Sequence, residues 1–190
     1  MMRMSALSSW ALTCGVAVLA FAVALPSCTS LRDGVADPIG RRFPTVVAES
    51  LDGQKVRLPE DFAGKPLVAI VATEQEAQFD IDRWLIGLLE LETPAAIREV
   101  PTVAGFVPGL LRGTIDGGMR RGIPEEDWGS VITLYGDNAA RVVDFFGNRN
   151  PRNGRIVLVS PDGTISWVHD RGFSARVLRD LDQRVRAMQP

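Results

Sequence analysis

A continuous apolar run at residues 67–72 (LVAIVA), followed directly by a helical pattern, sets the strongest limit on how this chain folds. A β-branched run of this length, without alternating polar residues, is typical of a parallel strand that is covered on both faces. From residue 76 to about residue 91, apolar side chains recur at helical spacing, with charged side chains between them. A buried strand that leads into an amphipathic helix predicts an α/β domain.

The rest of the chain continues the alternation of strands and helices. Asp-Gly pairs at residues 52–53 and 162–163 each separate two strand-like runs and predict two hairpins. Pro101 indicates an edge strand or an irregular one, because proline cannot donate to a ladder. The glycine-rich residues 106–121 are expected to be partly helical. The remaining strands are expected at residues 45–50, 55–58, 97–103, 131–135, 155–160 and 164–169, and the remaining helices at 139–146 and after residue 174.

Four segments of the chain resemble thioredoxin-like proteins of the periplasm. The early segments are Phe43-Pro44, the Leu-Asp-Gly turn at residues 51–53, and the LPEDFAGKP stretch at 58–66. The late segment, residues 156–165 (IVLVSPDGTI), is similar to the closing hairpin of the same fold. The resemblance covers most of residues 43–188. It implies a thioredoxin-like α/β domain over residues 41–190, with a mostly parallel central sheet, an N-terminal β-hairpin, a closing β-hairpin and flanking helices.

The N-terminus resembles a bacterial lipoprotein signal. Arg3 precedes an uncharged apolar run at residues 11–25, which is shorter than the roughly 20 residues that a membrane-spanning helix needs. The run ends in Leu25-Pro26-Ser27-Cys28, similar to a lipobox except for Pro26, where a small residue is usual. The resemblance implies that residues 1–27 are a removed signal peptide, that Cys28 carries lipid, and that residues 28–40 tether the domain to a membrane.

Two other interpretations of the N-terminus remain open, an ordinary cleaved signal peptide and an uncleaved anchor. The lipoprotein interpretation implies a lipid-anchored protein of the bacterial cell envelope, on the periplasmic face. If lipoproteins are sorted by the residue after the cysteine, Thr29 in place of Asp favours the outer membrane in a host with two membranes.

The segment where a thioredoxin-like protein carries its two reactive cysteines has no thiol here. The two positions fall near Glu76 and Phe79, and the cis-proline position of the family falls near Asn153. The two cysteines of the chain, Cys14 and Cys28, both precede the expected domain. Because the thiolate is the nucleophile of this chemistry, thiol–disulfide exchange and thiol peroxidase activity are excluded at this site. We therefore expect that the protein is not an enzyme.

A second resemblance points to a cysteine-less branch of the superfamily that includes the assembly factor of the mitochondrial ATP synthase. It rests on Gln75 and Gln78, on Asp-Arg-Trp at residues 82–84, and on MRRGIP at 119–124 with Trp128. In that branch the fold binds and chaperones other proteins. The resemblance implies a redox-inactive protein-binding or assembly factor.

The expected partner-binding face is the side where the reactive cysteines would lie, since ligands of open α/β sheets gather beyond the strand ends. Its candidate residues are Glu74, Gln75, Glu76, Gln78, Met119, Arg120, Arg121 and Trp128. The alternative is a non-thiol enzyme or a small-ligand-binding protein that uses His169, Asp116 or the carboxylates at residues 125–127. That alternative requires these groups to converge on one pocket.

Composition removes several other classes of function. With 21 Lys and Arg against 23 Asp and Glu, the formal charge of −2 gives no basic footprint for nucleic acid. One His and two Cys are too few for a zinc ribbon or an iron–sulfur cluster. We expect no cofactor, no metal and no nucleic-acid partner. The expected partners are the membrane, through Cys28, and another envelope protein.

Overall fold

The apolar run at residues 67–72 forms an interior strand of a seven-stranded sheet, with all six side chains buried. The computed structural model describes residues 36–105 and 109–189. The strands are β1 (Val46–Ser50), β2 (Lys55–Leu58), β3 (Leu67–Ala72), β4 (Ala96–Val103), β5 (Ile132–Tyr135), β6 (Arg155–Val159) and β7 (Ile165–His169). The α-helices are α1 (Gln78–Glu90), α2 (Gly109–Gly122), α3 (Gly136–Phe146) and α4 (Ala175–Arg186), and the short 3₁₀ helices are η1 (Glu60–Phe62), η2 (Gln75–Ala77) and η3 (Glu125–Ser130).

The strand order β2-β1-β5-β4-β3-β6-β7 confirms the α/β fold and both expected hairpins. The sheet is mixed: β3, β4 and β5 are parallel, and the strands on either side pair antiparallel. The two hairpins contribute four of the seven strands, so the parallel pairing expected for most of the sheet is confined to β3, β4 and β5. The parallel strands β3, β4 and β5 form the centre of the sheet. Because they run in the same direction, the segments that follow β3 and β4 leave the sheet at the same edge.

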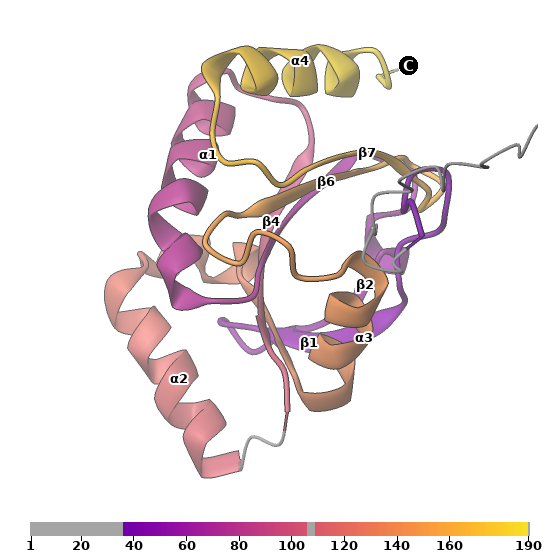
Figure 1. Ribbon diagram of the computed structural model, residues 1–190. Helices are drawn as coiled ribbons and strands as arrows, with labels where there is room; N and C mark the ends of the chain where they lie inside the picture. Colours follow the sequence, from indigo (N-terminus) through magenta and orange to yellow (C-terminus); the bar gives the residue numbers. More distant parts are fainter. Residues whose placement is uncertain (1–35, 106–108, 190) are drawn as a thin grey trace, which may run out of the picture. The chain divides into compact units, whose positions relative to one another are not determined.

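Two apolar cores lie on opposite faces of the sheet, and β3 and β6 contribute to both. Along β3, Val68 and Ile70 belong to one core, whereas Ala69 and Val71 belong to the other. Helices α1 and α4 cover the first face and α3 covers the second, as Figure 1 shows. Neither core includes a described residue of α2. The strand period of two therefore decides which helix each side chain meets.

Pro101 lies in an interior strand whose pairing is irregular at this residue, so the edge-strand alternative is wrong and the irregular strand is confirmed. Strand β4 runs between β3 and β5 in the sheet. Its pairing with β3 ends at Pro101, and its regular ladder with β5 begins at Thr102. An isolated bridge joins Glu99 to Val131 before the gap. Proline fits here because its missing N–H lies between the end of the β3–β4 ladder and the start of the β4–β5 ladder.

The glycine-rich segment after β4 was expected to be partly helical, and the helix α2 spans all of it from residue 109 onward. Residues 106–108 of the expected range lie outside the described residues. At the N-terminus, Gly40 donates a hydrogen bond to the Ile165 carbonyl, so the domain begins within the segment expected as a tether. Cys28 and the expected signal peptide lie outside the described residues. None of the helices that the structure describes is long and apolar enough to cross a membrane.

Candidate functional site

The carboxyl ends of β3, β4 and β5 lead into the polar segments at one edge of the sheet. After β3, the chain passes Thr73 and Glu74, turns through η2 and enters α1. The Thr102 hydroxyl donates to the Ala72 carbonyl at 2.7 Å and ties β4 to the end of β3. Buried Ala77 fixes the turn against the core, while Glu74, Gln75, Glu76 and Gln78 are exposed.

A second polar segment, the loop at residues 147–154, lies beside this turn. The Thr73 hydroxyl donates a hydrogen bond to the Asn148 side-chain oxygen at 2.8 Å, which joins the two segments directly. The loop holds its own shape, since the Asn153 amide donates to the Asn150 carbonyl and its side chain donates to the Asp170 carbonyl. Residues 149–153 line a small open pocket of about 210 Å³. We call the exposed residues of the turn and this loop the strand-end surface: Glu74, Gln75, Glu76, Gln78, Asn148, Arg149, Asn150 and Arg152.

The loop side of this surface is cationic. Arg149, Arg152 and Arg171 are exposed. Arg155 is buried, donates to the Gly147 carbonyl and forms an ion pair with Asp170 at 3.3 Å, so it neutralises that carboxylate. Guanidinium groups bind carboxylates through two parallel hydrogen bonds, and asparagine side chains add neutral donors and acceptors. The surface is therefore suited to a partner with acidic and polar side chains. The sequence analysis missed this loop, although three Arg and three Asn within residues 148–155 (NRNPRNGR) were a visible signal.

The other expected site residues form a separate group beside the start of β5. The Arg120 Nε donates to the Leu51 carbonyl at 2.7 Å, and its guanidinium lies 5.7 Å from the Trp128 ring centroid. Trp128 Nε1 donates to the Ile123 carbonyl. Met119 is half-buried and Arg121 is exposed. Within the described residues, no hydrogen bond, ion pair or ring contact joins this group to residues 74–78. Arg120 and Trp128 thus hold α2 and η3 in place.

The groups of the alternative enzyme site do not converge. Asp116 accepts a hydrogen bond from the Tyr135 hydroxyl at 2.7 Å. Burial, followed by this hydrogen bond, raises the pKa of Tyr135. His169 lies on β7, at the far edge of the sheet, where it stacks on Trp167 and its Nε2 lies 2.9 Å from the Gly172 carbonyl. Strands β4, β3 and β6 separate the two groups. Within residues 36–105 and 109–189, no group of three or more His, Cys, Asp or Glu could hold a metal ion.

One titratable group that the sequence analysis did not single out is Glu99 of β4. Its side chain is on the same face of the sheet as Ile70, the partner residue in β3, and is only 7% exposed. Burial, with a smaller contribution from the negative charge of Asp82 on α1, raises its pKa to about 7. An alternating strand pattern does not reveal such a residue, because its burial depends on the helices that cover it.

Known structures resemble this domain throughout, at low sequence identity. No protein-family model matches the chain, and no curated protein matches it in sequence. A thiol-disulfide oxidoreductase domain from Bacteroides vulgatus has a TM-score of 0.55 and 17% identity, covering 79% of this chain and 99% of its own. A SCO1/SenC family lipoprotein from Bacillus anthracis has a TM-score of 0.54 and 14% identity, with 81% and 98% covered. A member of the Sco family of cytochrome c oxidase assembly proteins has a TM-score of 0.56 and 12% identity, with 82% and 99% covered.

These likenesses establish that the chain has a thioredoxin-like fold. They give no support for the expected resemblance to the assembly factor of the mitochondrial ATP synthase. They also correct the expectation that the protein is not an enzyme, because the similar structures are mostly thiol:disulfide oxidoreductases, which are enzymes. The strand-end surface carries no cysteine, and this does not decide whether the protein catalyses another reaction.

Proposed function

We propose that this protein is a lipid-anchored thioredoxin-fold protein of the bacterial envelope, which binds another envelope protein through the strand-end surface. The observation that carries the proposal is the hydrogen bond from Thr73 to Asn148. It unites an exposed polar helix start with a loop rich in Arg and Asn, at the place where this fold commonly carries reactive cysteines. Binding there uses carboxylate, amide and guanidinium groups and no thiol–disulfide exchange.

The anchor and the location rest on the sequence of the N-terminus. Leu25 to Cys28 resembles a lipobox, and Cys28 would carry the lipid, with Thr29 favouring the outer membrane in a host with two membranes. Among the similar structures, one is described as a SCO1/SenC family lipoprotein, and another belongs to a family of cytochrome c oxidase assembly proteins. These descriptions support an envelope location and an assembly role for this chain.

Site-specific crosslinking in cells tests the binding surface. A photo-reactive amino acid is placed at Gln75, Gln78 or Arg152 on the strand-end surface, at Arg121 on the separate group, and at Gln183 on the outside of α4 as the control. We expect the same partner to be captured from the first three positions and not from Gln183. Capture from Arg121 alone would move the interface to the start of β5, and equal capture from Gln183 would contradict a specific surface.

A charge reversal tests the role of the cationic loop. We expect Arg152→Glu to weaken capture from Gln75 by at least tenfold, since a lost bidentate pair and a new repulsion act together. The matched control is Arg141→Glu, a reversal at an exposed arginine of α3. Unchanged capture by the Arg152 variant would remove the loop from the interface.

A further inference from the structure

Helix α1 carries large apolar side chains on two faces, and only one of these faces packs against the rest of the domain. Ile81, Trp84 and Leu88 are fully buried against the sheet and α4. On the outer face, Phe79, Ile86 and Leu89 are 75%, 56% and 67% exposed. A surface helix normally has one apolar stripe, and an uncovered second one marks an interaction surface.

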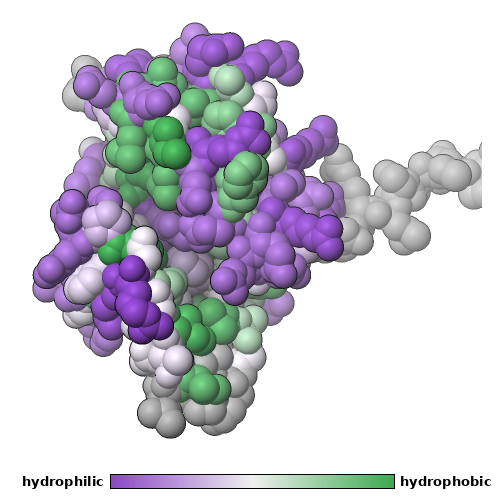
Figure 2. Space-filling model, turned by 90° about the vertical axis from the view of Figure 1, so that its left-hand side faces the viewer, coloured by the Kyte–Doolittle hydropathy of each residue, from purple (hydrophilic) through white to green (hydrophobic). Residues whose placement is uncertain are grey.

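The uncovered face continues into an open groove of about 380 Å³ between α1 and α4. The two helices approach closely there, since a Cβ on Gly87 would lie 2.5 Å from a methyl group of Leu178. The apolar lining comes from Ile86, Leu91, Phe173 and Leu178. Figure 2 shows this apolar area in its upper part, bordered by hydrophilic side chains.

The border of the groove is mainly cationic. Arg83 and Arg179 line it together with one carboxylate, Glu90. The Arg83 guanidinium lies 4.6 Å from the Phe173 ring centroid, so the cation is held directly at the apolar surface. Arg176 on the first turn of α4 adds another exposed positive charge. Exposed apolar side chains next to arginines are the pattern of a helix that lies in the interface of an anionic membrane.

We propose that this α1–α4 face docks on an anionic lipid surface. The inference rests on the lipid anchor at Cys28 from the proposed function. Cys28 and Ala36, the first described residue, are eight residues apart, a stretch that spans at most about 29 Å. An anchor of this length keeps the domain at the bilayer at high effective concentration, so a weak surface affinity suffices for docking. The apolar side chains enter the headgroup boundary while the arginines contact lipid phosphates.

The test uses purified protein that lacks residues 1–27 and carries Cys28→Ser, so no lipid is attached. Both apolar cores lie within residues 43–188, so this form keeps every residue of the folded interior. Binding to sedimenting vesicles of phosphatidylcholine, with and without phosphatidylglycerol, is measured for the parent and for Ile86→Ser combined with Leu89→Ser. The matched control is Leu111→Ser, an apolar residue of α2 that is 53% exposed. Thermal unfolding verifies that each variant folds.

We expect the parent to bind the anionic vesicles and added salt to weaken binding. The double variant should bind at least tenfold more weakly, and Leu111→Ser should bind like the parent. Equal binding by the double variant, or no binding by the parent, would overturn the proposal. A parent that is dimeric by light scattering, becomes monomeric in the double variant and does not bind vesicles would assign the face to a second copy instead.

The same double variant separates this proposal from the proposed function. Capture of a partner from Gln75 in cells depends on the strand-end surface and should persist in the double variant. A double variant that loses vesicle binding but still captures the partner would show that this face of α1 serves membrane docking and not protein binding. Vesicle binding without any capture would contradict the protein-binding function and leave the docking face intact.

Discussion

Asp80, on the first turn of α1, is a buried carboxylate that holds two distant loops. Its oxygens accept backbone hydrogen bonds from Gly154 at 3.0 Å and from Phe173 at 2.6 Å. These bonds fix the residue before β6 and the segment between β7 and α4 against the same helix. Because α1 begins at the strand-end surface, this carboxylate also sets the position of the loop at residues 147–154.

We predict that Asp80→Ala lowers the free energy of unfolding by about 2–4 kcal/mol, because the buried N–H of Gly154 and the partly buried N–H of Phe173 lose their acceptor. Chemical denaturation measures the loss. Asp144→Ala removes an exposed carboxylate from α3 and should change stability by less than about 0.5 kcal/mol. A loss as small as that control would mean that water replaces the carboxylate at both N–H groups.

Glu99 gives the domain a pH-dependent stability. Its pKa is raised to about 7 in the folded protein, from 4.5 for an ordinary glutamate, first by burial and then by Asp82. Between these values the folded state holds the proton more tightly than the unfolded state, so stability falls as pH rises from about 4.5 through 7. A rise in pKa from 4.5 to about 7 corresponds to roughly 3 kcal/mol of stability, which is lost across that range.

We predict that Glu99→Gln flattens this part of the stability profile and makes the protein more stable than the parent above pH 7. The measurement is urea unfolding in steps from pH 5 to pH 8. Asp82→Asn removes the nearby negative charge and should give a smaller decline than the parent shows. A parent profile that rises over this range would contradict an uncharged Glu99 in the folded state.

At the scale of elements, the prediction succeeded where the pattern is local. The strand expected at residues 67–72 has the observed bounds, because six successive apolar residues between a turn and a polar helix start admit one arrangement. The expected hairpin at Asp52-Gly53 is likewise observed. In each case the residues that decide the element lie within the element itself.

The prediction failed where the deciding contacts are distant in sequence. The interior place of β4 is set by pairing with β3 and β5, and the sequence around Pro101 holds no trace of that pairing. The Arg- and Asn-rich loop becomes part of a surface only through Thr73, 75 residues earlier in the chain. The Arg120 Nε donates to the Leu51 carbonyl, 69 residues earlier, and the sequence around Arg120 does not reveal this contact.

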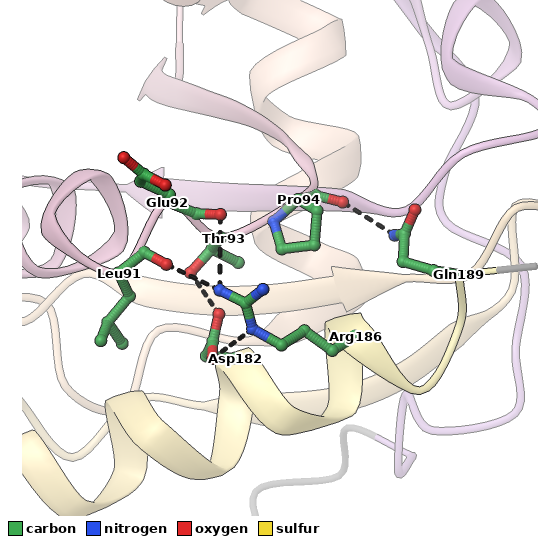
Figure 3. A network of polar contacts seen from close by, with 7 residues as sticks. All are labelled: Leu91, Glu92, Thr93, Pro94, Asp182, Arg186 and Gln189. Carbon is green, nitrogen blue, oxygen red and sulfur yellow. Dashed lines mark hydrogen bonds and ion pairs between the residues drawn. The ribbon is translucent and has the colours of Figure 1, made fainter.

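The end of α4 is connected to the turn between α1 and β4 by the polar network in Figure 3. Asp182 accepts from the Thr93 hydroxyl at 2.9 Å and from Arg186 Nε at 2.8 Å. Arg186 also donates to the Leu91 carbonyl at 2.7 Å. The network therefore connects α4 to the turn that follows α1. Helices α1 and α4 also form the proposed lipid-docking face.

We predict that Arg186→Ala lowers the free energy of unfolding more than a surface change does, since it leaves Asp182 and the Leu91 carbonyl without this donor. Arg184→Ala is the matched control, because Arg184 pairs only with Asp180 within the described residues and that pair is half exposed on the same helix. The control should cost less than about 0.5 kcal/mol. Denaturant midpoints compare the two variants, and equal losses would show that the network adds no more than a surface pair.

At the scale of the whole molecule, two surfaces of one domain are proposed to meet two kinds of partner. The strand-end surface is polar, with carboxylates on one side and arginines on the other, and suits a protein with acidic side chains. The α1–α4 face is apolar with a cationic border and suits a lipid surface. Helix α1 belongs to both surfaces, since it begins at the first and extends along the second. Docking on the membrane would therefore orient the strand-end surface relative to the bilayer.

The proposed lipid anchor on Cys28 can be tested in cells. In envelope fractions from cells, the full-length protein should sediment with membranes and incorporate labelled palmitate. Cys28→Ser should abolish the label, because this side chain would carry the lipid. Cys14→Ser is the matched control, since that cysteine lies inside the apolar run and should be removed with the signal. A Cys28 variant that loses no label would contradict lipidation at this residue.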